Sequence, residues 1–284
     1  MKNWFNEYRL SLKRPEAEEF IDIYFFRPIA FLIVKVLYRL PITPNQYSLM
    51  AFISGVLSAY FFLLPAEGSN RVMGAWFFFL FAVLDCCDGM QARMKKNGSP
   101  MGRIIDGLVD WSVNAAVYLA LFTSEYKYGL KSYAWLFLFS GVMKAMNSGL
   151  YDNILMEYLN HAEGKGNFLE NEFNTFKKDL AENKNSNFQK FGKKAYLFLL
   201  GMQIKAQKNT DKILNSQKYC EKNLVLLKMW GLIGPSMHII VLFVSFLMGK
   251  VEILFLYSTV MGFGWMLIMQ TIQKSINQKL AYEA

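Results

Sequence analysis

Four aspartates placed inside long apolar segments constrain this chain more than any other feature of its sequence. They fall within residues 84–111, in the string LDCCDGMQARMKKNGSPMGRIIDGLVDW, and are Asp85, Asp88, Asp106 and Asp110. The first two are three residues apart and the last two are four apart, so each pair lies on one face of a helix. Burying a carboxylate in an apolar environment is costly unless a cation or a proton compensates its charge. The spacing therefore predicts two helices that present their carboxylates to one common site.

The chemistry of that site follows from its charge. Two divalent ions would neutralise four carboxylates, and an all-oxygen ligand set suits magnesium or manganese better than zinc. A pair of such ions about 3.5 to 4 Å apart typically clamps a phosphate during an in-line displacement at phosphorus. Three small residues, Gly89, Ala92 and Gly102, lie on the same helical faces as the aspartates and would let a bulky ligand approach the backbone.

The same string resembles the signature of the CDP-alcohol phosphotransferase family. That signature reads D, two residues, D-G, two residues, A-R, eight or nine residues, G, three residues, D, three residues, D. Its fixed positions are filled here by Asp85, Asp88, Gly89, Ala92, Arg93, Gly102, Asp106 and Asp110. The signature covers about a tenth of the chain, and the string ITPNQYSL at residues 42–49 is similar to the start of the family's first spanning helix.

The resemblance implies a role for each motif residue. Asp85, Asp88 and Asp106 would bind metal, and Asp110 would bind metal while also acting as the general base. The nucleotide site would be lined by Gly89, Ala92 and Arg93, together with Gly102.

The resemblance also implies the reaction, which is transfer of a phospho-alcohol unit from a CDP-alcohol to an acceptor hydroxyl with release of CMP. We expect a phosphatidyl group to be transferred, in phospholipid biosynthesis. The motif also serves enzymes that use CDP-choline or CDP-ethanolamine with a diacylglycerol acceptor. The run RPIAFLIVKVLYRLPITPNQYSL further resembles family members that join soluble inositol units, so the identity of the donor and of the acceptor stays open. A homodimer is implied by the family alone.

Composition places the chain in a membrane. Of its 284 residues, 54% are hydrophobic and 16% are aromatic, which exceeds the apolar share of an ordinary soluble domain. The net charge of +9 is more typical of cytoplasmic loops facing anionic lipid than of nucleic-acid binding, so no nucleic-acid partner is expected. Three cysteines give no disulfide framework, and the charged N-terminus shows no removable signal peptide.

The predicted fold is all-α, with six transmembrane helices and an N-terminal interfacial amphipathic helix. The arm at residues 1–41 contains that amphipathic helix, at about 15–40, and residues 42–284 form the catalytic membrane domain. The six spans are expected at about 45–64, 72–93, 102–122, 133–150, 223–249 and 251–271, with a helical extension of the fourth to residue 159 and a kink at Gly234-Pro235 in the fifth. A lysine-rich insertion at 160–222 is expected to fold as surface helices outside the chemical site.

Lysine and arginine placement predicts the orientation. One set of loops holds only Arg71, Lys127, Lys131 and Lys250, whereas the arm, the loop at 93–103 and the insertion are densely basic. Basic loops stay in the cytoplasm. Both termini and the aspartate site are therefore expected to face the cytoplasm, in the bacterial inner membrane.

Some residues have two interpretations. His238 is expected to form an interhelical hydrogen bond rather than to act as an acid or a ligand. Arg27, Lys35 and Arg39 are expected to hold the first helix to lipid headgroups, although recruitment of an anionic lipid donor is the alternative. For the whole chain, the alternative function is a cation- or proton-coupled transporter, which would place its carboxylates near the membrane midplane within inverted repeats.

Overall fold

The protein is helical throughout the part described by the structure, a computed structural model. That part comprises residues 2–12, 14–163, 168–181, 190, 193–194, 196–198, 200–201, 204 and 216–282. No strand occurs among these residues, which confirms the all-α class.

The helices follow one another with short connections. The N-terminal arm contains α1 (Lys2–Ser11), the π-helical turn η1 (Asp22–Phe26) and α2 (Arg27–Val36), and four long helices follow it. These are α3 (Pro44–Leu63), α4 (Asn70–Lys95), α5 (Pro100–Tyr128) and α6 (Lys131–Glu163). The remainder is α7 (Phe168–Ala181), α9 (Ser216–Trp230), η2 (Gly231–Ile233), α10 (Pro235–Leu247), α11 (Glu252–Leu256), the π-helical η3 (Tyr257–Trp265) and α12 (Met266–Tyr282).

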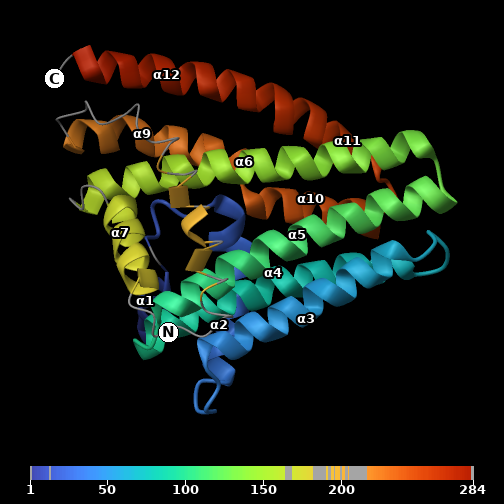
Figure 1. Ribbon diagram of the computed structural model, residues 1–284, viewed down its shortest axis with the longest axis horizontal. Coiled ribbons are helices and arrows are strands. Elements are labelled where there is room, and N and C mark those ends of the chain that lie inside the picture. Colours follow the sequence, from blue (N-terminus) through green and yellow to red (C-terminus); the bar gives the residue numbers. More distant parts are fainter. Residues whose placement is uncertain are drawn as a thin grey trace.

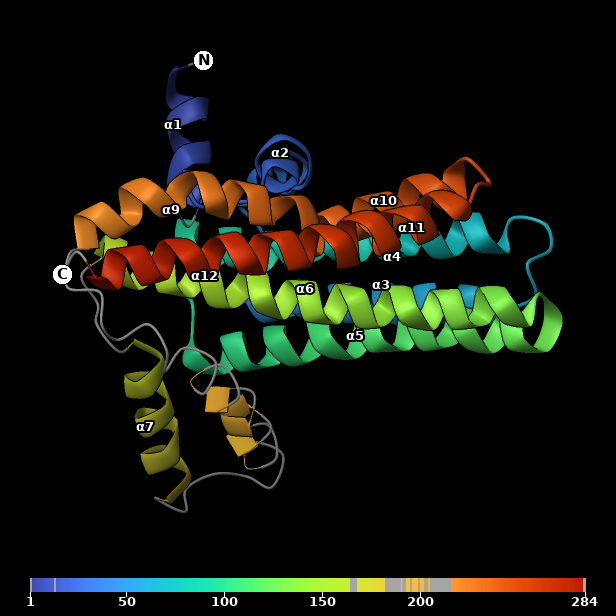
Figure 2. The same cartoon turned by 90° about the horizontal axis from the view of Figure 1, so that it is seen from above.

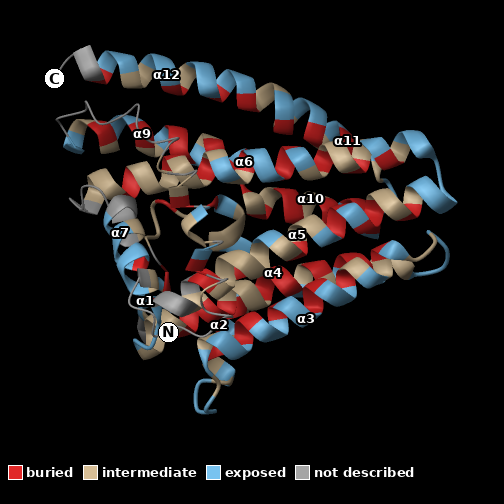
Figure 3. Cartoon of the chain, viewed as in Figure 1, coloured by how far each residue is buried: buried red, intermediate tan, exposed pale blue. Residues whose placement is uncertain are grey.

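The long helices form one elongated bundle. Helix α3 packs against α4 and α5, α5 packs against α6, and α10 packs against α4 (Figure 1). Helix α4 and helix α10 are largely buried, whereas α3 and α12 are exposed along their outer faces (Figure 3). The exposed face of α3 is apolar and includes Leu49, Phe52, Ile53 and Val56. An apolar outer face is what a lipid-facing helix requires.

Five helices are long and apolar enough to cross a membrane, so the protein is an integral membrane protein. They are Pro44–Leu63, Asn70–Lys95, Ile104–Tyr128, Ser216–Leu247 and Glu252–Leu280. The expected fourth span, at 133–150, is not among them. It lies in α6, which runs beside the other bundle helices (Figure 2). Its mean hydropathy is reduced by polar residues such as Ser140, Lys144 and Asn147, which are buried inside the protein and do not face lipid.

The predicted interruption of the fifth span is present. Helix α9 ends at Trp230, a single 3-10 turn follows, and Gly234 adopts an extended conformation with φ −68° and ψ 169° before α10 begins at Pro235. Proline has no backbone N–H to continue the helical ladder, which explains why the chain restarts there.

His238 forms the interhelical contact that the sequence predicted. Its Nε2 lies 3.2 Å from Nδ2 of Asn147, whose amide also donates to the Gly262 carbonyl at 3.0 Å. The pair therefore joins α6, α10 and η3 in the middle of the bundle.

The arm differs from the single helix expected at 15–40. Regular helix begins near Phe20 and ends at Val36, and α2 is seen end-on in Figure 2 while the bundle helices run across the view. Helix α2 thus lies across the bundle axis, with Ala30, Phe31 and Val34 buried and Leu32 exposed. This is the orientation of a helix at a membrane surface, but its interfacial role stays a prediction.

Arg27 does not serve as the headgroup anchor that the sequence favoured. Its guanidinium turns inward, where it pairs with Glu18 at 2.8 Å, and its side chain is only 16% exposed. Lys35 pairs with Glu7 of α1, and Arg39 is exposed.

Within the expected insertion at 160–222, α6 continues to Glu163 and α9 begins at Ser216, and the bounds of the insertion stay a prediction. Its described helix, α7, extends away from the bundle (Figure 2).

Close packing of α5 against α6 gives a testable consequence. A β-carbon added at Gly141 of α6 would lie 2.7 Å from Cβ of Tyr118, whereas one added at Gly149 of the same helix meets nothing within 4 Å. Overpacking costs about 1–3 kcal/mol, so we expect Gly141→Ala to lower the thermal unfolding temperature of the detergent-solubilised protein. Gly149→Ala should leave it unchanged or raise it, since alanine favours helix by about 1 kcal/mol over glycine. Equal unfolding temperatures would contradict this packing.

Candidate active site

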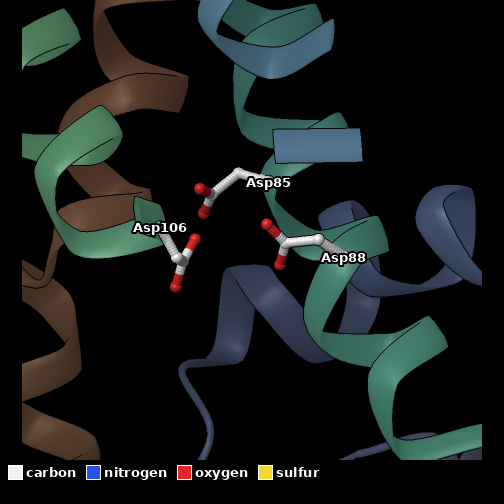
Figure 4. Close-up of side chains that lie close together, drawn as sticks. All are labelled: Asp85, Asp88 and Asp106. Atoms are coloured by element: carbon white, nitrogen blue, oxygen red, sulfur yellow. The ribbon is translucent and has the colours of Figure 1, made fainter. Parts of the chain in front are cut away.

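Three of the four motif aspartates converge between α4 and α5. Asp85 and Asp88 project from α4 and Asp106 projects from α5, and their carboxylates point toward one another (Figure 4). One oxygen from each lies within 4.8 Å of the others. The sequence thus predicted both the helices and their shared site.

A tight connection between α4 and α5 sets this geometry. Helix α4 ends at Lys95, its C-cap residue Lys96 adopts the left-handed conformation with φ 52°, and α5 starts at Pro100 after the N-cap residue Ser99. The Ser99 hydroxyl accepts a hydrogen bond from the Gly102 amide at 2.9 Å. Proline at the first helical position and serine at the N-cap are the residues expected at a helix start. The chain therefore reverses in a few residues and brings Asp106 back opposite Asp88.

The start of α3 contacts one side of the cluster formed by Asp85, Asp88 and Asp106. The Ser48 hydroxyl donates a hydrogen bond to Oδ2 of Asp88 at 2.6 Å, and both residues are buried. A β-carbon at Gly102 would come within 3.1 Å of Oδ1 of Asn45, so glycine at 102 leaves room for that side chain. Sequence reasoning missed Ser48, although the likeness at residues 42–49 pointed to this segment.

Asp110 lines the same cavity but is not part of the group of three. It lies one helical turn after Asp106 on α5, and its Oδ1 accepts a hydrogen bond from Nδ2 of Asn114 at 2.7 Å. Asn114 follows Asp110 by four residues and continues the same helical stripe, a spacing that would have identified it. The hydrogen bond from the amide orients the carboxylate of Asp110.

The aspartates open into a cavity of about 380 Å³. Its lining includes all four motif aspartates and four further acids from outside the motif, namely Glu18, Glu19, Asp22 and Asp152. It also includes three guanidinium groups, those of Arg14, Arg27 and Arg93. On α6, the buried side chain of Lys144 lies close enough to Asp110 for their charges to interact. The site is therefore a polar, highly charged compartment inside an apolar bundle.

The N-terminal arm forms one wall of this cavity. Tyr151 of α6 donates a hydrogen bond to the Ala17 carbonyl at 3.2 Å, and Ser236 of α10 donates to Asp22 at 2.7 Å. The Glu19 carboxylate lies directly against Gly234, at the start of α10, where a side chain would collide with it. A helix N-terminus favours negative charge, which explains why two acids of the arm are found there. No motif in the sequence indicated that the arm reaches the site.

Burial also affects the acids of the arm. It raises the pKa of Glu19 well above the usual range of a carboxyl group, and the nearby charge of Asp22 raises it further. Burial likewise raises the pKa of Asp22, although the neighbouring Arg27 guanidinium opposes that effect.

The residues predicted to line the nucleotide site fall into two groups. Gly89 and Arg93 line the cavity, whereas Ala92 and Gly102 are not among its lining residues. A β-carbon at Gly89 would lie 3.4 Å from Nη1 of Arg93, so glycine there makes room for the guanidinium. The part played by Ala92 and Gly102 in nucleotide binding stays a prediction.

Residues 41–167 match the family model for CDP-alcohol phosphatidyltransferase, and this range contains the whole aspartate motif. The resemblance identified from the motif is thereby confirmed. The family implies a phosphotransferase that uses a CDP-alcohol. No curated protein matches the chain. The arm and the helices from α7 onward lie outside the matched range.

If the group of three binds metal, loss of one carboxylate will weaken Mn²⁺ binding to the purified protein, measured by electron paramagnetic resonance. We expect Asp88→Asn to raise the dissociation constant on the order of tenfold or more, since even groups that only orient a ligand contribute that much. Asp152→Asn removes the same charge from the same cavity but lies outside the group, so its effect should be smaller. Equal effects of the two substitutions would mean that general charge, not ligation, governs binding.

Proposed function

We propose that this chain, whose residues 41–167 match the CDP-alcohol phosphatidyltransferase family, transfers a phospho-alcohol group from a CDP-alcohol to an acceptor hydroxyl and releases CMP. The observation that carries the proposal is the convergence of Asp85, Asp88 and Asp106 from two helices onto one cavity. The family match favours this reaction over the transporter alternative.

The donor set fits a hard divalent ion. Carboxylate oxygens are the ligands that magnesium and manganese prefer, and oxygens within 4.8 Å of one another can share one ion or bridge two. We propose two such ions, held by Asp85, Asp88, Asp106 and Asp110. When bound, they would neutralise the carboxylates and stabilise negative charge on the diphosphate.

Asp110 is the proposed general base. The acceptor oxygen forms a bond to the phosphorus of the transferred group, and the bond from that phosphorus to the oxygen of CMP breaks. CMP keeps the electron pair of the broken bond, and the proton of the acceptor hydroxyl passes to Asp110. The Asn114 amide supports this role because its hydrogen bond to Oδ1 orients the carboxylate of Asp110.

The neighbouring motif residues are proposed to hold the nucleotide. Gly89 and Arg93 lie on the cavity wall, where the guanidinium can donate hydrogen bonds to a phosphate. We place Ala92 and Gly102 at the edge of the same nucleotide site.

We propose that the reaction belongs to phospholipid biosynthesis, with a phosphatidyl group transferred and a homodimer as the working unit. We further propose six spans in total, the five apolar helices and α6, which is the fourth in chain order. Helix α6 has 33 residues and runs beside the five apolar helices. Its buried polar side chains would then face the site and not the lipid.

The proposed setting is the bacterial inner membrane, with the site and both termini in the cytoplasm. The distribution of lysine and arginine along the sequence supports this orientation, since the arm, the connection at 93–103 and the insertion are densely basic, whereas the loops at the other ends of the proposed spans hold few basic residues. CDP-linked substrates and magnesium would be available on that side.

The reaction is tested by CMP release from the purified protein, offered a panel of CDP-alcohols and acceptor alcohols. We expect CMP only with a matching pair and with Mg²⁺ or Mn²⁺ present. EDTA should abolish release, and added metal should restore it. Full turnover in excess EDTA would contradict the metal proposal, and no CMP from any pair would contradict the reaction.

In the same assay, Asp110→Asn keeps the shape of the side chain but cannot accept the proton. Loss of a positioned base typically lowers the rate about a hundredfold to ten-thousandfold, so we expect a loss of that size with CMP binding retained. Ser112→Ala, on the same helix, is the matched control, because the Ser112 hydroxyl donates to the Val109 carbonyl of its own helix. Near wild-type turnover by Asp110→Asn would remove Asp110 as the base.

The orientation is tested by labelling single cysteines in a variant whose Cys86, Cys87 and Cys220 are replaced by alanine. Residue 185, in the middle of the insertion, lies outside the described residues, so the exposed Asn174 of α7 is the better position. We expect Asn174→Cys to react with a membrane-impermeant maleimide only after cells are opened. Ser69→Cys, in the turn between α3 and α4, should react in intact cells. The reverse pattern would invert the orientation.

A further inference from the structure

Arg27 brings a guanidinium into the cavity from outside the aspartate motif and outside the range matched by the family model. It is the first residue of α2, and its Nη2 lies 2.8 Å from Glu18 and 3.9 Å from Asp22. Both acids therefore approach the same end of the guanidinium. Its Nε is buried and forms no hydrogen bond with the described residues.

Arg93 presents a similar group on the neighbouring wall. Its Nε donates to the Ser11 carbonyl at 2.5 Å, which fixes the side chain against the end of α1. Its Nη2 is buried and forms no hydrogen bond within the described part of the chain. The two guanidinium groups lie close enough for their charges to interact.

Two neighbouring guanidinium groups with unpaired buried donors favour the binding of an anion. A guanidinium stays protonated in proteins, so its buried N–H groups remain donors, and leaving a buried donor unpaired is unfavourable. Two positive groups near each other also repel unless negative charge lies between them. A phosphate answers both requirements, because it accepts several hydrogen bonds and carries negative charge.

We propose that Arg27 and Arg93 together bind the phosphate that the reaction transfers, the one that links CMP to the alcohol in the donor. This inference rests on the proposed function and deepens it. Asp85 and Asp88, on the same wall as Arg93, lie beside the diphosphate in that arrangement. The arm then supplies a substrate-binding residue, and the site is incomplete without it.

The simpler interpretation is that Arg27 only fastens the arm through its ion pair with Glu18. The two interpretations differ in what they predict for ligands. If Arg27 only fastens the arm, its substitution should weaken the binding of every ligand of the cavity alike. If Arg27 binds phosphate, its substitution should weaken the binding of those ligands that carry the second phosphate. CDP and CMP differ by that phosphate alone.

The test is calorimetric titration of the purified full-length protein with CDP and with CMP, both in the presence of Mg²⁺. We expect Arg27→Gln to weaken CDP binding on the order of tenfold to a hundredfold, the loss typical of a hydrogen bond to a charged group. CMP binding should change less than about threefold. Arg9→Gln, an exposed arginine of the same arm, should change neither.

Two further variants separate recognition from folding. Glu18→Gln breaks the ion pair but keeps the guanidinium, so CDP binding should be retained or become tighter. Arg27→Lys keeps the ion pair but loses the fork of donors, so it should still weaken CDP more than CMP. Equal losses for both nucleotides in Arg27→Gln and Glu18→Gln would assign Arg27 to fastening the arm and overturn the proposal.

The remaining outcomes are also decisive. A phosphate carried by the acceptor is the other source of the same chemistry. If Arg27→Gln bound CDP and CMP normally but no longer bound inorganic phosphate alongside CMP, the pair would belong to the acceptor and the donor assignment would be wrong. If Arg27→Gln bound CDP as tightly as the wild-type protein does, Arg27 would not bind the donor phosphate. If the wild-type protein itself bound neither CDP nor CMP with Mg²⁺, the proposed function would fail.

Discussion

The structure depends on the compensation of buried negative charge. Eight carboxylates line a single cavity inside an apolar bundle, and such a concentration is stable only if cations, hydrogen bonds or protons offset the charges. The protein supplies part of this itself. Ser48 donates a hydrogen bond to Asp88, Asn114 donates one to Asp110, and the guanidinium of Arg27 lies beside Glu18 and Asp22. Divalent ions at the motif aspartates would supply the rest.

The same requirement explains the placement of polar residues that the membrane would otherwise exclude. Lys144 and Asn147 make α6 too polar to qualify as a span by composition, yet both are buried. Lys144 lies near Asp110, and Asn147 joins α10 to η3 through His238 and Gly262. The arm is held in a comparable way, with its acids at the start of α10. Polar groups thus define the interior of this bundle, and apolar groups define its outer face.

The sequence predicted those features that depend on local spacing. The two helical stripes of aspartates, the break at Gly234 and the hydrogen bond of His238 each follow from residue types at known intervals, and the structure confirms them. It could not predict contacts between distant segments. Arg27 shows why: a charged residue beside an apolar helix usually anchors to headgroups, and only the folded arm shows that Glu18 and Asp22 draw it inward. Ser48 and Asn114 were missed because a single polar residue in a span has many ordinary explanations. The count of six spans is not confirmed for a related reason. The mean hydropathy of α6 is too low for a span, because a mean hydropathy does not record which face of a helix contacts protein.

We propose above all that the converging aspartates hold divalent metal against the diphosphate of a CDP-linked substrate. The most direct measurement is an experimental structure with Mn²⁺ and CDP, in which anomalous scattering locates the metal. We expect manganese about 2 Å from carboxylate oxygens of Asp85, Asp88 and Asp106, with the diphosphate of CDP bound to the same ions. Manganese located elsewhere, or CDP bound away from these aspartates, would contradict it.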